Sequence, residues 1–456
     1  MKYVPSLDKN FKPAILEVRD FIKRVEESGL ENELTICLER TKGYNYFYKI
    51  KVFQDNKGHD DENFEIVERI VKSILWVVGG FRFYIAGSHE LAKRLKEAYS
   101  PNGIRAFDYN FMSRVYENKF EVIECTVDEL PKEKKQEIVI EKNLNGCRIG
   151  FDAGGSDRKV SAVIDGEVVF SDEVVWFPKI NTDPQYHYEG ILDSMKTAAS
   201  YMPRVDCIGV SSAGIYIDNK VAVASLFLKV PEDVFDKKVR NIYIDVAKEF
   251  GDVPLVVAND GDVTALAGSM ELNDDKVLGI AMGTSEAGGY VGDNGRLLGW
   301  LNELAFVPVD FNKDSIVDEW SGDYGCGVKY FSQDSVIKLA EYAGIKLDED
   351  LSPARKLAII QDMNKEGNPI AHEIFENIGI YLGYTLAYYS LFYDIKHVLL
   401  LGRVVSGNGG NTILAKAREV LYSEFKELAH IVFHLPDEKN RRVGQSIAAA
   451  SLPKID

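Results

Sequence analysis

Long apolar runs are missing from this 456-residue sequence. The most apolar stretch, SILWVVGGF at 73–81, is far shorter than the ~20 residues that a membrane-spanning helix needs. The N-terminus also lacks the charged-then-apolar pattern of a signal peptide. We therefore expect no membrane association and a cytoplasmic location.

Closely spaced cysteines are missing as well. The five cysteines are scattered, and no two are near enough to form a CxxC pair. In a chain of this size the spacing favours free, buried thiols in a reducing compartment over a disulfide framework. The residues are Cys37, Cys125, Cys147, Cys207 and Cys326.

Positive charge is in deficit. Lysine and arginine number 54 against 71 aspartates and glutamates, so the formal net charge is −17. Because an acidic surface repels phosphates, nucleic acid is not expected as the main partner. The hydrophobic fraction of 46% and the charged fraction of 27% indicate a soluble globular protein. Domains usually hold ~100–200 residues, so this length predicts two to four of them.

Residues 1–146 are predicted to form an α+β domain. Alternating segments at 33–40 and 45–53 indicate paired strands, and apolar residues at helical spacing over 62–78 indicate a helix. The charged segment 129–146 is the predicted linker, although EIVI within it would also suit an edge strand. The many strands argue against a winged helix-turn-helix, and we assign no function to this domain.

From residue 147 short apolar strands alternate with helices, in two successive sets. This pattern predicts an α/β fold of two related lobes. We expect one lobe over 147–258, completed by a C-terminal helix at 441–452, and the other over 259–440.

The stretch FDAGGSDRKV at 151–160 contains the first candidate site. Gly154, Gly155 and Ser156 at a hairpin tip can turn backbone N–H groups and a hydroxyl toward phosphate. Asp152, just before them, can hold a divalent metal through water. Taken alone, the loop favours a plain tight turn with a solvated aspartate.

A second glycine-and-hydroxyl tip occurs at Gly283, Thr284 and Ser285, again after a buried strand. Two such loops, one in each lobe, suit a nucleotide triphosphate held between them. A third glycine-rich loop follows the strand at 397–401, where Gly402, Gly407 and Gly409 leave room for an adenine ring. That loop is also compatible with an ordinary strand–loop–helix connection.

The segment PLVVANDGDVTALAG at 254–268 carries the candidate catalytic residue. A buried strand delivers Asn259 and Asp260 to the edge of the sheet where open α/β folds bind ligands. Asp260 can accept a proton from a sugar hydroxyl, and Asn259 can hydrogen-bond a neighbouring hydroxyl. The alternative is that the group Asp260, Gly261 and Asp262 caps the following helix.

With these motifs in this order, the chain from about 147 to 452 resembles the ROK (repressor–ORF–kinase) family of sugar kinases and sugar-responsive repressors. That family belongs to the acetate and sugar kinase, chaperone and actin superfamily. The resemblance implies two actin-like (ribonuclease H-like) lobes with a nucleotide cleft between them. It also implies ATP and Mg²⁺, Asp260 as catalytic base, sugar contacts from Gly214 and Glu303, and a homodimer.

The sequence departs from the family at several positions. Phe306 replaces the usual zinc-binding and sugar-contacting histidine, and Val328 replaces a sugar-contacting glutamate. Glu319, Ser321 and Cys326 fall at the three cysteine positions of the family's zinc site, so we predict no zinc. Glu286, inside the second phosphate loop, is expected to point to solvent, because a carboxylate facing the loop would repel phosphate.

The sequence therefore predicts an ATP-dependent sugar kinase, with a hexose or amino sugar as substrate. Arg158 or Lys159 could help to neutralise phosphate, although a solvated turn also explains both residues. Two alternatives stay open. One is a non-catalytic sensor of sugar or nucleotide that keeps the kinase fold, and the other is an ATPase acting on something other than a sugar.

Overall fold

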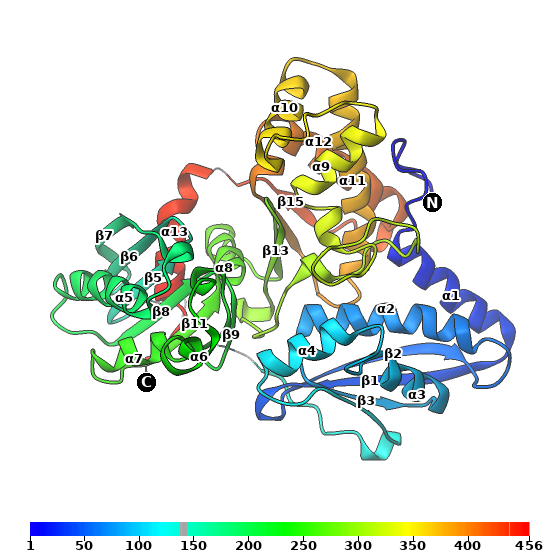
Figure 1. Cartoon of the computed structure of the whole chain (residues 1–456), viewed down its shortest axis with the longest axis horizontal. Helices are drawn as coiled ribbons and strands as arrows, with labels where there is room; N and C mark the ends of the chain where they lie inside the picture. The colour runs from blue at the N-terminus through cyan, green and yellow to red at the C-terminus, as the bar shows by residue number, and fades with distance from the viewer. Residues whose placement is uncertain (137, 139–143, 437, 456) are drawn as a thin grey trace. The chain divides into compact units, whose positions relative to one another are not determined.

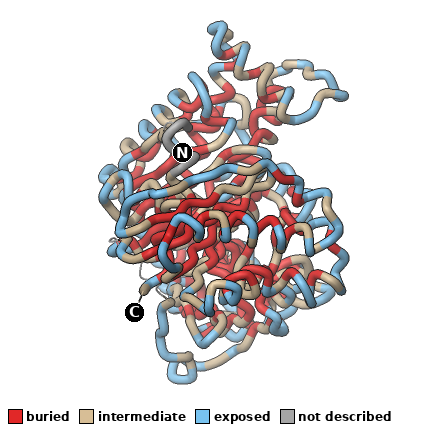
Figure 2. The backbone as a smooth tube through the Cα atoms, turned by 90° about the vertical axis from the view of Figure 1, so that its left-hand side faces the viewer, coloured by how far each residue is buried: buried red, intermediate tan, exposed pale blue. Residues whose placement is uncertain are grey.

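The computed structural model describes residues 1–136, 138, 144–436 and 438–455, and the chain divides into two compact units (Figure 1). Unit 1 consists of Met1–Gln136, Ile280–Gly288 and Trp300–Leu435. Unit 2 consists of Glu137–Gly279, Gly289–Gly299 and Pro436–Asp456. Buried positions run through the middle of strands and helices, while turns are mostly exposed (Figure 2).

The N-terminal part of unit 1 (residues 1–136) is built on a four-stranded sheet in the order β2-β1-β3-β4. β1 pairs antiparallel with β2 and β3, and β4 is parallel to β3. Its strands are β1 (Glu31–Glu39), β2 (Asn45–Phe53), β3 (Arg82–Ala86) and β4 (Glu121–Glu124). Its helices are α1 (Ala14–Ser28), α2 (Asp60–Val78), α3 (His89–Ala98) and α4 (Ala106–Val115). This agrees with the α+β character expected from the alternating strand pattern.

The remainder of unit 1 is mainly helical. α11 is buried on nearly every side along its second half, and it packs against α12. The helices are α9 (Gln333–Tyr342), α10 (Pro353–Lys365), α11 (Pro369–Tyr389) and α12 (Asn408–Glu424). They accompany a sheet in the order β13-β12-β14-β15. Its strands are β12 (Val277–Met282), β13 (Glu286–Val291), β14 (His397–Leu401) and β15 (Val432–His434), of which β12 and β13 run across the unit boundary.

Unit 2 contains a five-stranded sheet in the order β11-β8-β5-β6-β7. β6 is antiparallel to both β5 and β7, whereas β5, β8 and β11 are parallel. The strands are β5 (Cys147–Ala153), β6 (Asp157–Ile164), β7 (Glu167–Val175), β8 (Cys207–Ser212) and β11 (Leu255–Asn259). This three-stranded meander followed by two parallel strands is the ribonuclease H-like arrangement that the sequence predicts.

Helices and a small hairpin complete unit 2. The helices are α5 (Pro184–Ala199), α6 (Glu232–Val234), α7 (Ile242–Lys248), α8 (Asp260–Leu272) and α13 (Glu438–Ala450), and the hairpin joins β9 (Ile215–Ile217) to β10 (Lys220–Val223). α13 packs directly on the sheet because two strand glycines have no side chain. A Cβ on Gly150 would lie 1.7 Å from the Ser446 carbonyl, and one on Gly209 would lie 1.7 Å from that of Ala449.

The unit boundaries differ from the lobes expected at 147–258 and 259–440. α8 and the first half of β12 belong to unit 2, because α8 packs on α13 and on β8. The N-terminal part is not separate, since it shares unit 1 with Trp300–Leu435. The expected linker at 129–146 lies partly outside the described residues, as does most of EIVI; within it, Ile138 pairs with Leu297 of unit 2.

All five cysteines are free thiols, four of them buried and Cys125 partly exposed. None of the helices within the described ranges combines the length and apolar character that crossing a bilayer requires.

Candidate active site

Asn259 and Asp260 stand where β11 ends and α8 begins. The Asn259 side-chain oxygen accepts a hydrogen bond from the Gly261 N–H at 2.7 Å, so Asn259 is the helix cap. Its amide nitrogen donates to the Gly214 carbonyl at 2.7 Å. The helix cap is therefore Asn259 and not one of the residues 260–262. The same side chain links the start of α8 to the loop after β8.

Asp260 is only partly buried and lies at the N-terminus of α8. One carboxylate oxygen accepts from the Gly261 N–H at 3.0 Å. Burial raises the pKa of Asp260 to about 6, and the negative charge of Asp152 acts in the same direction. A carboxyl group with a pKa near the working pH is well suited to accept a proton as a general base.

Asp152 is the second-last residue of β5 and is buried. Its carboxylate accepts a hydrogen bond from the Ser211 hydroxyl at 2.7 Å, and Lys159 Nζ lies 3.8 Å away. Burial raises the pKa of Asp152, although the hydroxyl and the lysine both favour the ionised form. Asp152 pairs with Ser211 and Asn259 pairs with Ser212 across the central β8, so two motifs over a hundred residues apart meet in unit 2.

The first candidate phosphate loop, Gly154–Ser156, is the tip between β5 and β6, as predicted. The Gly154 carbonyl accepts from the Trp176 indole at 2.7 Å. An exposed lysine missed by the sequence reasoning lies beside the loop, since a Cβ on Gly155 would be 2.8 Å from Lys179 Nζ. Lys179 is 23 positions after Ser156, and nothing in the sequence links it to the glycines.

Arg158 and Lys159 make other contacts. The Arg158 side chain donates to the Ser194 hydroxyl at 2.7 Å and lies over the Trp176 ring. Lys159 Nζ donates to Asp157 at 2.7 Å. Of the two, only Lys159 adjoins Asp152, so the cation best placed beside the loop glycines is Lys179.

Gly214 must be a glycine for conformational reasons. Its φ of +138° lies in the region that L side chains rarely adopt, and a Cβ would be 2.4 Å from the Val223 carbonyl. Its own carbonyl is the acceptor for Asn259. The segment matched to the family's substrate loop is therefore joined to the segment that carries Asp260.

The second glycine-and-hydroxyl loop is also a strand tip. Thr284 and Ser285 are exposed between β12 and β13, and the Gly283 carbonyl accepts from the Gln333 N–H at 2.8 Å. Further along, the backbone of β13 in unit 2 touches the start of α8. A Cβ on Gly289 would lie 2.1 Å from the Gly261 carbonyl, and the Tyr290 N–H donates to Asp262 at 3.0 Å.

The third glycine loop follows β14 in unit 1. A Cβ on Gly402 would lie 2.3 Å from the Met282 carbonyl, so this glycine allows β14 to end directly against β12. Gly407 has a φ of +66° and open space around it, whereas Gly409 lies against Phe375. Gly402 therefore lies next to the loop at 283–285. Gly407 precedes α12 at its cap position, and a side chain there would meet no neighbouring atom.

Glu286 does not point to solvent, so that expectation is wrong. It is the first residue of β13, where Ala287 is exposed and Glu286 faces inward with 3% of its surface accessible. One carboxylate oxygen accepts from the Tyr389 hydroxyl at 3.4 Å, and the other has no hydrogen-bond partner. Burial raises the pKa of Glu286 to about 8. A neutral, inward-facing carboxyl group does not repel phosphate at the loop.

Replacing Glu286 with glutamine is expected to change how stability depends on pH. In the folded chain Glu286 keeps its proton up to a pKa of about 8, whereas the unfolded chain loses it near 4.5. The free energy of unfolding therefore falls as pH rises between these values, by about 1.4 kcal/mol per unit of pKa difference. Between pH 5, 6.5 and 8, the melting temperature of Glu286→Gln should rise relative to that of the wild type as the pH increases. The exposed Glu366→Gln, also in unit 1, should track the wild type, and a Glu286→Gln curve parallel to it would contradict the assignment.

The segment matched to the family's zinc site contains an ion-pair cluster around Asp323. Cys326 is buried, with Lys72 Nζ 3.8 Å from its sulfur. Asp323 accepts from Lys72 at 2.5 Å and from Arg69 at 2.7 Å. No group of three or more histidines, cysteines or acidic residues able to hold a metal occurs among the described residues. That no zinc binds stays a prediction.

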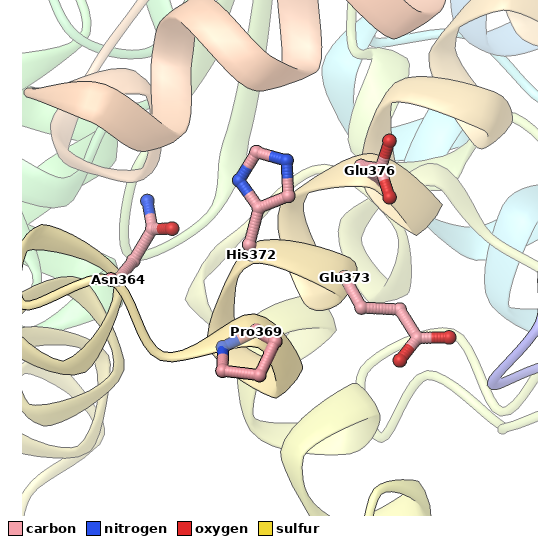
Figure 3. A pocket seen from close by; sticks show the side chains of 6 residues that line it. Asn364, Pro369, His372, Glu373 and Glu376 are labelled. Carbon is pink, nitrogen blue, oxygen red and sulfur yellow. The ribbon is translucent and has the colours of Figure 1, made fainter.

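A separate open pocket lies where α10 meets α11 (Figure 3). His372 and Glu376 project into the same opening, one helical turn apart. Glu373 instead accepts a hydrogen bond from Ser6. The pocket contains none of the candidate residues, and its glutamates disfavour a phosphate-bearing ligand. It is lined by Asn364, Gly367, Pro369, His372, Glu373 and Glu376.

The structure thus gathers the candidate residues in two groups. Asp152, the loop 154–156, Gly214, Asn259 and Asp260 belong to unit 2. The loop 283–285, Glu303, Gly402 and Gly407 belong to unit 1. The ribonuclease H-like sheet of unit 2 defines the actin-like class of fold.

Comparison with known proteins confirms this fold. No family model matches the sequence, and no curated protein matches it. Among solved structures, the chain is similar to a ROK hexokinase from Thermus thermophilus, with 17% identity and a TM-score of 0.53 over 67% of this chain and 97% of that one. A ROK family glucokinase from Streptomyces griseus, solved with glucose and AMPPNP, gives 21% identity and a TM-score of 0.47 over 68% and 99%. The similarity to the hexokinase shows that the fold expected from the resemblance to ROK sugar kinases is present.

Proposed function

We propose that this protein is an ATP-dependent sugar kinase of the ROK family, which phosphorylates a hydroxyl group of a hexose or amino sugar. The observation that carries the proposal is Asp260, a partly buried carboxylate where the edge strand β11 gives way to α8, with a pKa raised to about 6. The fold shared with a ROK hexokinase supports it.

In the proposed reaction Asp260 accepts the proton of the sugar hydroxyl as its oxygen attacks the γ-phosphate of ATP. Asn259 and Gly214 hold the Asp260 segment in place through their 2.7 Å hydrogen bond, and Asn259 keeps one amide proton for a sugar hydroxyl. Glu303 of unit 1 accepts from another hydroxyl of the sugar.

The nucleotide is proposed to bind the two loop tips. Gly154, Gly155 and Ser156 offer backbone N–H groups with Lys179 beside them, and Gly283, Thr284 and Ser285 offer exposed hydroxyls. Gly402 and Gly407 are proposed to border the adenine. These groups suit phosphoryl transfer, which needs mainly positioning and charge neutralisation.

Asp152 fits the requirement for Mg²⁺, which favours one or two carboxylates and keeps several waters. Its buried carboxylate is already oriented by Ser211, so it can hold a hydrated ion through water. The ion when bound supplies positive charge for the phosphates. We further propose a cytoplasmic homodimer that has neither nucleic acid nor membrane as partner.

Release of ADP tests the proposal directly. Purified protein with Mg·ATP is incubated with a panel of hexoses, amino sugars and their N-acetylated forms. We expect ADP release that depends on at least one sugar. ADP release independent of sugar would indicate an ATPase instead. Calorimetric binding of sugar without ADP release would indicate the non-catalytic sensor, which the replacement of two family sugar contacts by Phe306 and Val328 favours.

A further inference from the structure

Glu303 and Phe306 flank a single short helical turn. A 3₁₀ helix spans Leu304–Phe306, with Glu303 as its non-helical cap, and the Phe306 N–H donates to the Glu303 carbonyl at 3.2 Å. Leu304 and Ala305 are buried, whereas Glu303 and Phe306 are partly exposed. The accessible residues of this turn are therefore an acidic and an aromatic residue three positions apart.

The Phe306 ring continues into aromatic residues of the N-terminal part. Its centroid lies 4.3 Å from that of Trp76 on α2 and 5.9 Å from that of Phe107 on α4. Phe107 stacks with Phe111, with 5.7 Å between centroids. Trp76 is fully buried, while the three phenylalanines each keep part of their surface accessible. We call Phe107, Phe111 and Phe306 the aromatic surface.

This surface stands in a fixed position relative to Glu303. The last carbonyl groups of α2 accept hydrogen bonds from the segment that carries Glu303: Leu301 donates to Val78 at 3.2 Å, Asn302 to Val77 at 2.9 Å, and Glu303 to Trp76 at 3.1 Å. These contacts satisfy carbonyl groups that a helix end leaves unpaired. The Trp76 indole in turn donates to Asp108 of α4 at 2.5 Å. The N-terminal part therefore holds both the carboxylate and the rings.

We propose that the N-terminal part forms a section of the substrate site and that the aromatic surface binds a second ring attached to the phosphorylated sugar. This inference rests on the proposed function. Because Phe306 follows Glu303 by one short turn, a substituent of a sugar held by Glu303 is proposed to reach the Phe306 ring. The C–H face of a second pyranose, or an aryl group, pairs favourably with an aromatic face. The methyl group of an N-acetyl substituent is too small to cover three adjoining rings, so an N-acetyl sugar would leave part of the aromatic surface uncovered. The substrate class is therefore a ring-bearing glycoside.

The test compares each parent sugar with its ring-bearing derivatives. Initial rates of ADP release are measured with glucose, mannose and galactose, with their p-nitrophenyl glycosides, and with the disaccharides cellobiose, maltose and lactose. We expect a kcat/KM at least about threefold to tenfold higher for a ring-bearing glycoside than for its parent, the range of one aromatic contact. Preference for aryl glycosides or for disaccharides distinguishes the two kinds of ring.

Variants of the aromatic surface locate the effect. Phe107→Ala and, as a milder change, Phe107→Leu should reduce the ratio of kcat/KM between glycoside and parent sugar, mainly through KM. Tyr201→Ala, which removes an exposed aromatic ring stacked on Phe170 in unit 2, should leave that ratio unchanged. Melting curves confirm that each variant folds.

Three outcomes would overturn the inference. Parent sugars used as well as their glycosides would show that the aromatic surface has another role, while the proposed function stands. An equal loss for both substrate classes in Phe107→Leu would show a purely structural role. No ADP release with any sugar would remove the proposed function, and this inference with it.

Discussion

Replacing Asp260 with asparagine is expected to lower kcat by about 10²–10⁴-fold, the usual contribution of a positioned general base. Asparagine keeps the size of the side chain and the acceptor for the Gly261 N–H, so α8 should begin as before. Sugar and nucleotide binding, measured by calorimetry, should change little. Glu271→Gln removes an exposed carboxylate from the same helix and serves as the matched control. Full turnover by Asp260→Asn would exclude this residue as the base.

The pH profile gives an independent check on the same residue. Because the base must be ionised and its pKa is about 6, kcat/KM of the wild type should fall about tenfold per pH unit below that value. Lys159→Met removes the cation beside Asp152. The negative charge of Asp152, which raises the pKa of Asp260, is then less neutralised, so the acidic limb of the kcat/KM profile should move to higher pH. A flat profile between pH 5 and 8 would contradict the assignment.

Replacing Asp323 with asparagine is expected to destabilise unit 1 by about 3–5 kcal/mol, because removing one partner of a buried ion pair leaves its counter-ions uncompensated. Arg69, Lys72 and Arg105 all contact the Asp323 carboxylate, and all are buried. Burial alone would raise the pKa of Asp323, but these three cations hold it far below its usual range. Loss of the carboxylate therefore removes the counter-ion of Arg69 and Lys72, whereas Arg105 keeps its ion pair with Glu68.

Urea unfolding, followed by circular dichroism, measures this effect. Glu319→Gln is the matched control, because Glu319 belongs to the same segment and pairs with Lys329 but keeps 74% of its side chain exposed. Lys329 is buried but keeps Asp334 as a second partner at 2.9 Å, and an ion pair with an exposed partner such as Glu319 contributes only about 0–1 kcal/mol. The double variant Asp323→Asn with Lys72→Met should recover part of the loss, since it removes one stranded charge. Equal losses for Asp323→Asn and Glu319→Gln would show that the buried cluster does not stabilise the unit.

Local pattern accounts for the elements that carry the candidate site. The short apolar strands expected from residue 147 are present, and the hairpin tip expected at Gly154–Ser156 joins β5 to β6. The strand-to-helix junction at Asn259 and Asp260 was also located correctly. These features depend on neighbours within a few residues, so a single sequence contains the information that determines them.

Glu286 shows where this reasoning fails. Its charge suggested solvent, but it opens β13, and the two-residue period of the strand turns it inward beside Tyr389. The direction of the side chain depends on the residue at which β13 begins. The loop sequence from Gly283 to Ser285 does not indicate that residue. α1 was not anticipated, and neither were the contacts of residues 1–13 with α11, such as the hydrogen bond from Leu7 N–H to Asn377 at 3.1 Å.

The sequence by itself located the strands of unit 2, the two glycine-and-hydroxyl tips and the strand-to-helix junction at Asp260, because strand periodicity and turn residues act locally. The ribonuclease H-like order of those strands was implied by the resemblance to the ROK family. Only the tertiary structure decided that the N-terminal part shares a unit with Trp300–Leu435. It alone placed three buried cations around Asp323 and the end of α2 against Glu303. Those contacts join residues more than two hundred positions apart, and burial of charge and aromatic surface at such separations depends on the folded chain as a whole.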